Sequence, residues 1–266
     1  MHHFETITVE KQDGVAKITF NRPDKMNAFN PKMSDELKEA VADIKKDKEV
    51  RVVVMTGAGD RAFMAGADID KTILAWVEMT RKGGRVLDDH KVYFSPNMLE
   101  ELPQPVIAAV NGIAFGMGCE IALGCDIRIA SDAAQFGQPE IKLGIMCGGG
   151  GSVRLTRLVG SGKALEMCLT GDPIDAQEAY RIGLVNQVVP AAELENAVAV
   201  MIKKLKAKGA VALDFTKQSI YNTLEEGMKE SVEKEGELFS DIFKTEDALE
   251  GAKAFLEKRK PNFQNK

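Results

Sequence analysis

The stretch Asn111-Gly-Ile-Ala-Phe-Gly-Met-Gly-Cys-Glu120 places a carboxylate directly after glycine-rich backbone that can turn sharply. A second carboxylate follows twenty positions later, in Gln135-Phe-Gly-Gln-Pro-Glu140-Ile-Lys-Leu-Gly144. The glycines of the first stretch also free backbone N–H groups to point at a ligand. Two carboxylates in one pocket can hold a water and exchange protons with a substrate, because their mutual repulsion drives their pKa values apart. We therefore expect Glu120 and Glu140 to form acid/base machinery.

The composition is ordinary for a soluble globular protein, with 44% hydrophobic and 28% charged residues among 266. The net charge of −5 argues against a constitutive nucleic-acid binder, which usually has a basic balance. No apolar stretch approaches the roughly 18 residues that a membrane span needs, and the first residues lack the pattern of a signal peptide. We expect a cytoplasmic protein that binds neither membrane nor nucleic acid.

The sequence lacks the usual metal-binding and disulfide patterns. The four cysteines show no metal-ligand spacing and no CxxC pair, so buried thiols are favoured over disulfides. Two of the three histidines stand at positions 2 and 3, so a histidine triad or a zinc site has only His90 to rest on. We expect no metal.

Hydrophobic spacing and turn residues predict a mixed α/β chain. Strands are expected at Val15–Phe20, Val52–Thr56, Val106–Val110, Ile127–Ala130 and Val185–Val189. Helices are expected from an N-cap at Ser34 to about Lys46, over residues 152–159 and 163–169, and from an N-cap at Asp175 to Arg181. Broken helices around Gly83-Gly84 are expected in Ala67–Leu102, and three helical stretches between Ala192 and Lys258. Residues 1–191 are predicted to form the core with the active site, and residues 192–266 a C-terminal helical region.

Two loops are candidates for binding a substrate carbonyl. Ala65-Gly66-Ala67-Asp68-Ile69 follows a buried strand, and on its own it is typical of a tight turn with a helix cap at Asp68. Gly116-Met117-Gly118 also follows a buried strand, and it begins an apolar helix whose start presents free N–H groups. Two such donors from separate loops would make an oxyanion hole.

Each glutamate also has a purely structural interpretation. Glu120 in the first turn of a helix can complement the helix dipole. The residues around it are apolar, however, so this acid is expected to be buried, and a buried unpaired acid is costly. This favours a functional role for Glu120. Glu140 follows a proline that opens a helix, which is a common arrangement, so alone it favours neither interpretation.

Together these segments resemble the crotonase (enoyl-CoA hydratase/isomerase) superfamily over nearly the whole chain. The segments that carry the resemblance are Ile18-Thr-Phe-Asn-Arg-Pro23, Asn27-Ala28, Phe63-Met-Ala-Gly-Ala-Asp68, Pro105-Val-Ile-Ala-Ala-Val-Asn-Gly112, Gly118-Cys-Glu-Ile-Ala-Leu-Gly-Cys-Asp126, Phe136-Gly-Gln-Pro-Glu140, Arg154-Leu-Thr-Arg157, Leu169-Thr-Gly-Asp172 and Phe255-Leu-Glu-Lys-Arg-Lys260. So many segments in the right order make the resemblance specific, whereas a lone GxGxxE does not. It implies a spiral of strand–strand–helix repeats with a C-terminal helical region that builds homotrimers, commonly stacked into hexamers.

The resemblance also implies roles for individual residues. The oxyanion donors are the backbone N–H groups of Ala67 and Met117, and the catalytic acids are Glu120 and Glu140. Coenzyme A is part of the substrate rather than a separate cofactor, and the residues expected to contact it or the rest of the substrate are Ala28, Ala65, Gly66, Asp68, Ile69 and Gly116. Phe255 and Lys258 are expected to reach the coenzyme A of a neighbouring subunit, Lys258 toward its phosphates.

The activity implied by the resemblance is hydration of an enoyl-CoA across its α,β double bond, a hydro-lyase reaction of acyl-CoA degradation. Both carboxylates are retained, which favours hydration over isomerisation, because isomerisation can work with the second alone.

Three departures from the family pattern touch the pocket or its lid. Met117 replaces a glycine, Asp70 replaces a lysine, and Cys147-Gly-Gly-Gly-Gly151 replaces a pattern that begins with proline. A cyclic dienoyl-CoA substrate, isomerisation and thioester hydrolysis therefore stay open as alternatives. An RNA-binding or interaction protein on the same fold is the non-enzymatic alternative, and the intact site argues against it.

Overall fold

The computed structural model describes residues 4–86 and 93–265. A six-stranded sheet has the order β1 (Ile7–Gln12), β2 (Val15–Phe20), β3 (Val52–Gly57), β5 (Val106–Val110), β7 (Ile127–Ser131) and β10 (Gln187–Val189). β1 and β2 form an antiparallel hairpin, and the other neighbours pair in parallel. A second sheet has the order β4 (Ala62–Met64), β6 (Ile113–Phe115), β8 (Gln135–Gly137) and β9 (Ile174–Asp175).

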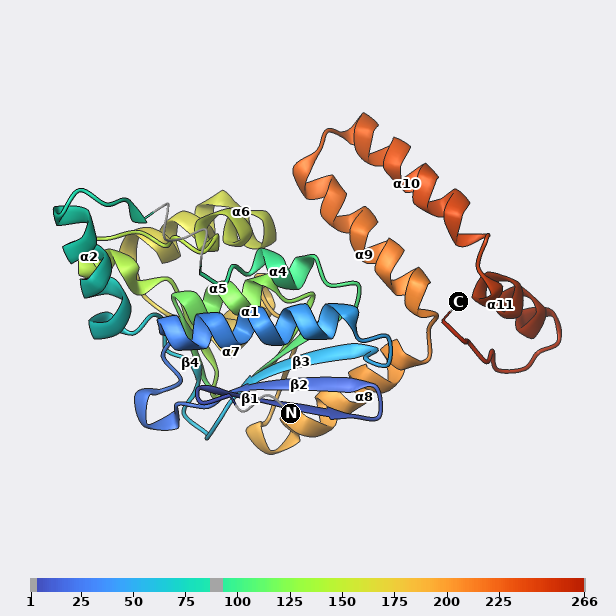
Figure 1. Ribbon diagram of the computed structural model, residues 1–266, viewed down its shortest axis with the longest axis horizontal. Helices are drawn as coiled ribbons and strands as arrows, with labels where there is room; N and C mark the ends of the chain where they lie inside the picture. Colours follow the sequence, from blue (N-terminus) through green and yellow to red (C-terminus); the bar gives the residue numbers. More distant parts are fainter. Residues whose placement is uncertain (1–3, 87–92, 266) are drawn as a thin grey trace.

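Three times the chain passes from the first sheet to the second and then into helix. β3 leads to β4, then to α2 (Leu74–Arg81) and α4 (Asn97–Glu100); β5 leads to β6 and α5 (Met117–Gly124); β7 leads to β8 and α6 (Gly151–Thr170). Since β3, β5 and β7 are neighbours in one sheet and β4, β6 and β8 in the other, each repeat stacks on the one before it. This confirms the expected spiral of strand–strand–helix repeats (Figure 1).

Both faces of the six-stranded sheet are buried at its middle strands, β3 and β5. Along β3, Val53 and Met55 belong to the cluster under α1 (Pro31–Lys46) and α5, whereas Val52 and Val54 belong to the cluster under α8 (Leu194–Lys206). Side chains of a strand alternate between its two faces, so a continuous run of β-branched residues is what a strand covered on both sides needs. The run Val52–Thr56 was predicted as a strand for this reason, and the prediction is confirmed.

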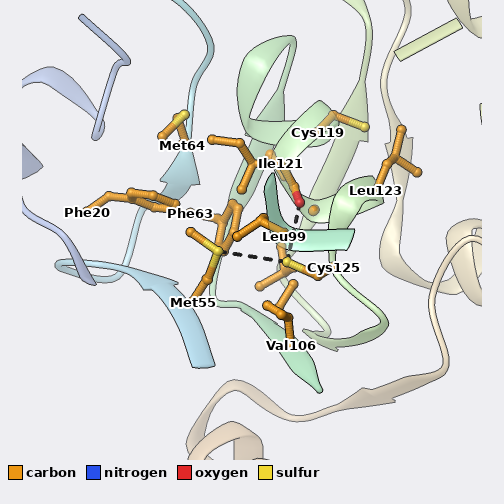
Figure 2. Packing of buried hydrophobic residues seen from close by; sticks show 14 of the residues in the cluster. Phe20, Met55, Phe63, Met64, Leu99, Val106, Cys119, Ile121, Leu123 and Cys125 are labelled. Carbon is orange, nitrogen blue, oxygen red and sulfur yellow. Dashed lines mark hydrogen bonds between the residues drawn. The ribbon is translucent and has the colours of Figure 1, made fainter. Parts of the chain in front are cut away.

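The larger cluster joins the two sheets to the helix that carries the first glutamate. Figure 2 shows Met55 of β3 and Phe63 of β4 close to Ile121 of α5. Phe20 packs edge to face on Phe63, with ring centroids 5.1 Å apart. The thiol of Cys125 donates to the carbonyl of Ile121 at 3.3 Å. The packing of this cluster places α5 beside β4 and so helps to determine where the N-terminus of α5 lies.

The cysteines are free thiols, as expected. Cys119, Cys125 and Cys147 are buried, and Cys168 is half-buried.

The C-terminal helices α9 (Ala210–Glu225), α10 (Met228–Ile242) and α11 (Glu246–Leu256) project away from the two sheets (Figure 1). Lys217 of α9 anchors them, because its ammonium is buried and pairs with Asp126 at 2.9 Å. Tyr221 donates to the same carboxylate at 2.9 Å. Large apolar side chains are exposed along these three helices: Ile220, Leu224, Met228, Val232, Phe239, Phe243, Leu249, Phe255 and Leu256.

The expected N-cap at Ser34 is wrong. The helix begins one turn earlier, at Pro31, and the side chain of Asn30 caps it by accepting from the N–H of Met33 at 2.8 Å. A proline at the first helical position needs no N–H partner, which makes Asn30-Pro31 the stronger start signal. Ser34 is buried, and its hydroxyl accepts from the N–H of Phe94 at 2.7 Å.

Some other expected boundaries are confirmed, and others need correction. The two helices expected over residues 152–159 and 163–169 are confirmed, because α6 is divided by a kink at Gly160, whose φ of +80° and ψ of 160° are not helical. Four helices, α8 to α11, replace the three expected after Ala192. The last strand begins at Gln187, because the amides of Leu184 and Val185 bond to the carbonyl of Ala179, at the end of α7 (Ala176–Arg181).

The sequence did not reveal β1 or the short strands of the second sheet. α2 ends before Gly83-Gly84 as expected, but His90 and part of the expected broken helices lie outside the described residues. The boundary between residues 191 and 192 stays a prediction.

Candidate active site

The first donor loop leads from β4 into a helical turn, η2 (Ile69–Ile73). Phe29 pairs with this loop in a parallel bridge: its N–H donates to the carbonyl of Gly66 at 2.8 Å, and its carbonyl accepts from the N–H of Asp68 at 2.7 Å. These bonds use the residues on either side of Ala67, so the N–H of Ala67 takes no part in the bridge. Gly66 itself has φ +110°, a conformation that L side chains rarely adopt.

The second donor loop joins β6 to α5. Gly116 has φ +50° and ψ −121°, and Met117 is the first residue of the helix, so its N–H has no acceptor inside the helix. A Cβ on Gly118 would lie 2.0 Å from the carbonyl oxygen of Met64, so only glycine lets α5 pack this closely on β4. A Cβ on Gly116 would lie 3.7 Å from Cα of Gly66, which places the two donor loops side by side.

Glu120 lies in the first turn of α5 with only 3% of its surface exposed. One carboxylate oxygen accepts two backbone hydrogen bonds, from the N–H of Gly149 at 2.7 Å and from that of Gly151 at 2.9 Å. Burial raises the pKa of Glu120, and these two N–H donors and the charge of Arg154 oppose that rise. The expectation that Glu120 is buried is confirmed, and the structure shows which N–H groups bind its carboxylate.

Glu140 lies in a short helical turn, η3 (Pro139–Leu143), and is half-buried. One of its carboxylate oxygens is 2.9 Å from the position that a Cβ on Gly116 would take, so the carboxyl group lies against the second donor loop. The amide nitrogen of Gln138 is 3.1 and 3.2 Å from the two carboxylate oxygens, in the amide orientation that satisfies both of its ends. Burial, with a contribution from the charge of Glu120, raises the pKa of Glu140 to about 7.

Both glutamates and both donor loops line one cavity of about 640 Å³. Its walls are mostly apolar, and the residues outside the donor loops that line it include Phe29, Ile73, Trp76, Val77, Leu143, Ile145 and Met146. Among the residues that the structure describes, Lys142 is the only other charged side chain that lines it. A carbonyl bound between the donor loops would therefore present its neighbouring carbons to two carboxyl groups in a largely apolar space.

Some of the other predicted contact residues line this cavity and some do not. Ala65 and Ile69 line the cavity with Gly66 and Gly116. Asp68 and Ala28 do not line it; both are bound by Arg22, which pairs with the Asp68 carboxylate at 2.9 Å and donates at 2.5 Å to the carbonyl of Ala28. Asp68 also caps η2 through the N–H of Lys71.

Phe255 and Lys258 lie at and just beyond the end of α11, at the opposite end of the molecule from α2 (Figure 1). Phe255 is 83% exposed. Neither residue reaches the cavity of its own chain. Both residues are exposed, and a role for them in binding the substrate stays a prediction.

Sequence reasoning assigned no role to several residues that border the site. Gln138 stood inside the quoted second frame, but nothing in the pattern showed that its amide faces Glu140. Arg154 was part of a family segment without a role, and it binds the loop that holds Glu120. Trp76 was noted only as the single tryptophan, and it forms part of the apolar wall.

Within residues 4–86 and 93–265, no group of three or more histidine, cysteine, aspartate or glutamate side chains is arranged to hold a metal ion. The helices of the described chain include none that is long and apolar enough to cross a membrane.

Comparison with known proteins gives consistent matches. The family model described as enoyl-CoA hydratase/isomerase matches residues 10–266. A short-chain-enoyl-CoA hydratase of Clostridium acetobutylicum is 44% identical, and the alignment covers 96% of this chain and 95% of that protein. A crotonyl-CoA hydratase of Syntrophomonas wolfei is 42% identical, with 99% of each chain covered.

Solved structures agree with these sequence matches. The crystal structure of an enoyl-CoA hydratase from Bacillus anthracis superposes with a TM-score of 0.88 at 37% identity, covering 98% of this chain and all of that one. That of an enoyl-CoA hydratase from Mycobacterium smegmatis gives 0.86 at 32% identity, covering 97% and 99%.

Proposed function

The chain belongs to the enoyl-CoA hydratase/isomerase family, and from this membership we propose that it hydrates enoyl-CoA thioesters across their α,β double bond. One observation carries the proposal: two carboxyl groups and two glycine-framed backbone donors line a single apolar cavity. An isomerase that only moves a proton has no need of a second carboxyl group, whereas hydration needs one group to activate water and another to protonate carbon.

The thioester carbonyl is bound by the N–H groups of Ala67 and Met117. Negative charge develops on the carbonyl oxygen as water adds at Cβ, and these donors stabilise it. The dipole of α5, whose N-terminus is Met117, acts in the same direction. Losing one donor of this kind typically lowers the rate by about 10²- to 10³-fold.

Glu120 acts as the base and Glu140 as the acid. Two N–H donors stabilise the ionised carboxylate of Glu120, and its charge raises the pKa of Glu140, which favours the protonated form of Glu140. The oxygen of a water bound between the pair forms a bond to Cβ and gives a proton to Glu120, while Glu140 gives its proton to Cα. After this step Glu120 is protonated and Glu140 is ionised. Because the two carboxyl groups are coupled, the apparent pKa values belong to the pair rather than to either residue.

The proposed substrate class is an enoyl-CoA with an apolar acyl group. The cavity walls are apolar, and the two relatives described above are named for short-chain and crotonyl substrates. Coenzyme A enters as part of the substrate, and the chemistry needs no separate cofactor.

We also propose that the chain assembles into trimers or hexamers through α9 to α11. These helices expose several large apolar side chains, among them Phe239 and Phe243, which pack edge to face with centroids 5.0 Å apart. In such an assembly Phe255 and Lys258 contact the coenzyme A bound by a neighbouring subunit.

A screen of crotonyl-CoA, longer enoyl-CoA thioesters and cyclic dienoyl-CoA thioesters with purified protein tests the proposal. Hydration is read from the loss of absorbance of the conjugated thioester and from a product mass that has gained one water. We expect crotonyl-CoA or another linear enoyl-CoA to be hydrated. Release of free coenzyme A, or a shifted double bond without a gain in mass, would contradict hydration as the activity.

A further inference from the structure

The loop that holds Glu120 is built almost entirely of glycine. Gly148 to Gly151 are four consecutive glycines, and a Cβ on three of them would collide with a functional side chain. At Gly149 it would lie 2.5 Å from a carboxylate oxygen of Glu120, at Gly150 2.0 Å from Nη1 of Arg154, and at Gly151 2.4 Å from the amide of Gln138. The close approach therefore favours glycine at these positions, and glycine leaves the backbone with more conformational freedom than any other residue.

A flexible loop does not by itself aim two N–H groups at one oxygen. The donors to Glu120 belong to the peptide before Gly149 and to the peptide before Gly151. Between them lies the peptide whose carbonyl oxygen belongs to Gly149. Nη1 of Arg154 donates to that oxygen at 3.1 Å. Arg154 thus fixes the one peptide that connects the two donors.

Arg154 is itself held on its other side. Its Nε and Nη2 donate to the two carboxylate oxygens of Glu100, at 2.6 and 2.9 Å, and Nη2 also donates to the side chain of Asn97. The planar guanidinium can make this bidentate pairing, whereas the ammonium group of a lysine cannot. The side chain of Arg154 is only 11% exposed and that of Glu100 21%, so the pair is largely shielded from solvent.

We propose that Arg154 is a positioning residue for hydration, which holds the Gly148–Gly151 loop so that its amides orient Glu120 as the base. Arg154 touches no reacting atom and acts through the loop. The proposal rests on the proposed function, since it concerns how the base of that reaction is held.

The positive charge of Arg154 also favours the ionised form of Glu120, which is the form that acts as the base. The ionisable groups that face Glu120 are Glu140 on η3, Cys119 on α5, and Arg154 and Cys168 on α6, with Glu100 of α4 behind Arg154. Arg154 is the cation among them, and it lowers the pKa of Glu120 against the effect of burial. Removing it raises the pKa of Glu120 further, so less of the base is ionised at neutral pH.

The test compares Arg154→Met with Arg157→Met, a matched control one turn further along the same helix, where the arginine is exposed. In Arg154→Met we expect kcat to fall on the order of 10²-fold, the usual effect of misplacing a catalytic group by about 1 Å. The KM should change little, and the acidic limb of the pH profile should move to higher pH. Amide hydrogen exchange of residues 145–151 should become faster. Arg157→Met should match the wild type in all of these measurements.

A second variant separates positioning from stability. Arg154→Met leaves Glu100 without a partner, so it can lower the Tm by itself. Arg154→Met combined with Glu100→Met removes both charges and should restore much of the Tm while kcat stays low and loop exchange stays fast. Arg154→Lys keeps the positive charge but cannot make the bidentate pairing with Glu100. Its kcat should therefore lie between those of the wild type and Arg154→Met.

Recovery of full activity together with stability in the double variant would overturn the proposal, as would an unchanged pH profile and unchanged loop exchange in Arg154→Met. A wild-type protein without hydratase activity would instead contradict the proposed function. Loop exchange tests the role of Arg154 even in that case.

Discussion

Replacing Gly149 with alanine adds one methyl group next to the carboxylate of Glu120. The added Cβ would lie 2.5 Å from Oε2 and 2.9 Å from Cδ of Glu120, and 3.3 Å from the sulfur of Met117. Gly149 does not have the left-handed φ that an alanine would strain, so the methyl contact is the main perturbation. To reach an ordinary contact, the carboxylate or the loop must retreat by roughly 0.5 to 0.9 Å.

A displacement approaching 1 Å at a catalytic group costs on the order of 10²-fold in rate. We therefore expect Gly149→Ala to lower kcat by roughly 10- to 100-fold, which corresponds to about 1.4 to 2.7 kcal/mol in the activation barrier. The KM should change less than kcat, because the added methyl group lies closer to the Glu120 carboxylate than to the side chain of Met117. Initial rates of crotonyl-CoA hydration, measured over a range of substrate concentrations, give kcat and KM separately.

The matched control is Gly162→Ala, on α6. A Cβ there meets nothing within 4 Å, and alanine favours a helix over glycine. This variant should keep wild-type kcat and KM. Wild-type kcat in Gly149→Ala, with the fold confirmed by an unchanged Tm, would refute the reasoning that Glu120 must occupy its present position.

Four further predictions concern the pair, the pocket and the assembly. Glu140→Gln should abolish most turnover while coenzyme A binding and the Tm stay near wild type, and hydration within a few-fold of wild type would place the proton donor elsewhere. Hydration kcat/KM should fall above about pH 7, because burial raises the pKa of Glu140 to about 7 and the acid must be protonated; a flat profile between pH 6 and about 9 contradicts this. Met117→Gly should change kcat/KM unequally among acyl groups, and an equal change for all of them would place this side chain outside the acyl site. Ending the chain before Lys253 should raise KM more than it lowers kcat, whereas a fully active monomer in light scattering would contradict the shared site.

Much of the fold was predictable because its signals are local. The buried strands are short runs of β-branched residues, and Asp175 caps its helix through the N–H of Glu178 as expected. The glycine frames around both glutamates were also readable, because Gly116 and Gly144 have a positive φ that other residues rarely adopt. The family resemblance then supplied the roles of the residues.

The second sheet was missed because its strands are too short to show a pattern. β4, β6 and β8 have three residues each, and their pairing depends on partners far away in sequence. The start of α1 was placed one turn late, because Ser34 resembles a cap and the better signal was Asn30-Pro31. In each case the local sequence did not show which distant residues the segment would contact.

The contacts that tune the site could not be predicted for the same reason. Gly149 and Gly151 reach Glu120 from about thirty positions further along the chain, and Arg154 is bound by Glu100, 54 positions earlier. The spacing of residues along the chain does not predict which of these distant groups come into contact. The buried pair of Lys217 and Asp126, which anchors the C-terminal helices, was likewise invisible in the sequence.

The central claim is that water adds to an enoyl-CoA through the combined action of Glu120 and Glu140. Incubation of the purified protein with crotonyl-CoA in oxygen-18 water, followed by mass spectrometry of the thioester product, tests this claim most directly. We predict one labelled oxygen per product molecule with the wild type, at a rate that falls sharply in both Glu120→Gln and Glu140→Gln. An unlabelled thioester, or label incorporated at the wild-type rate by either variant, would contradict the account.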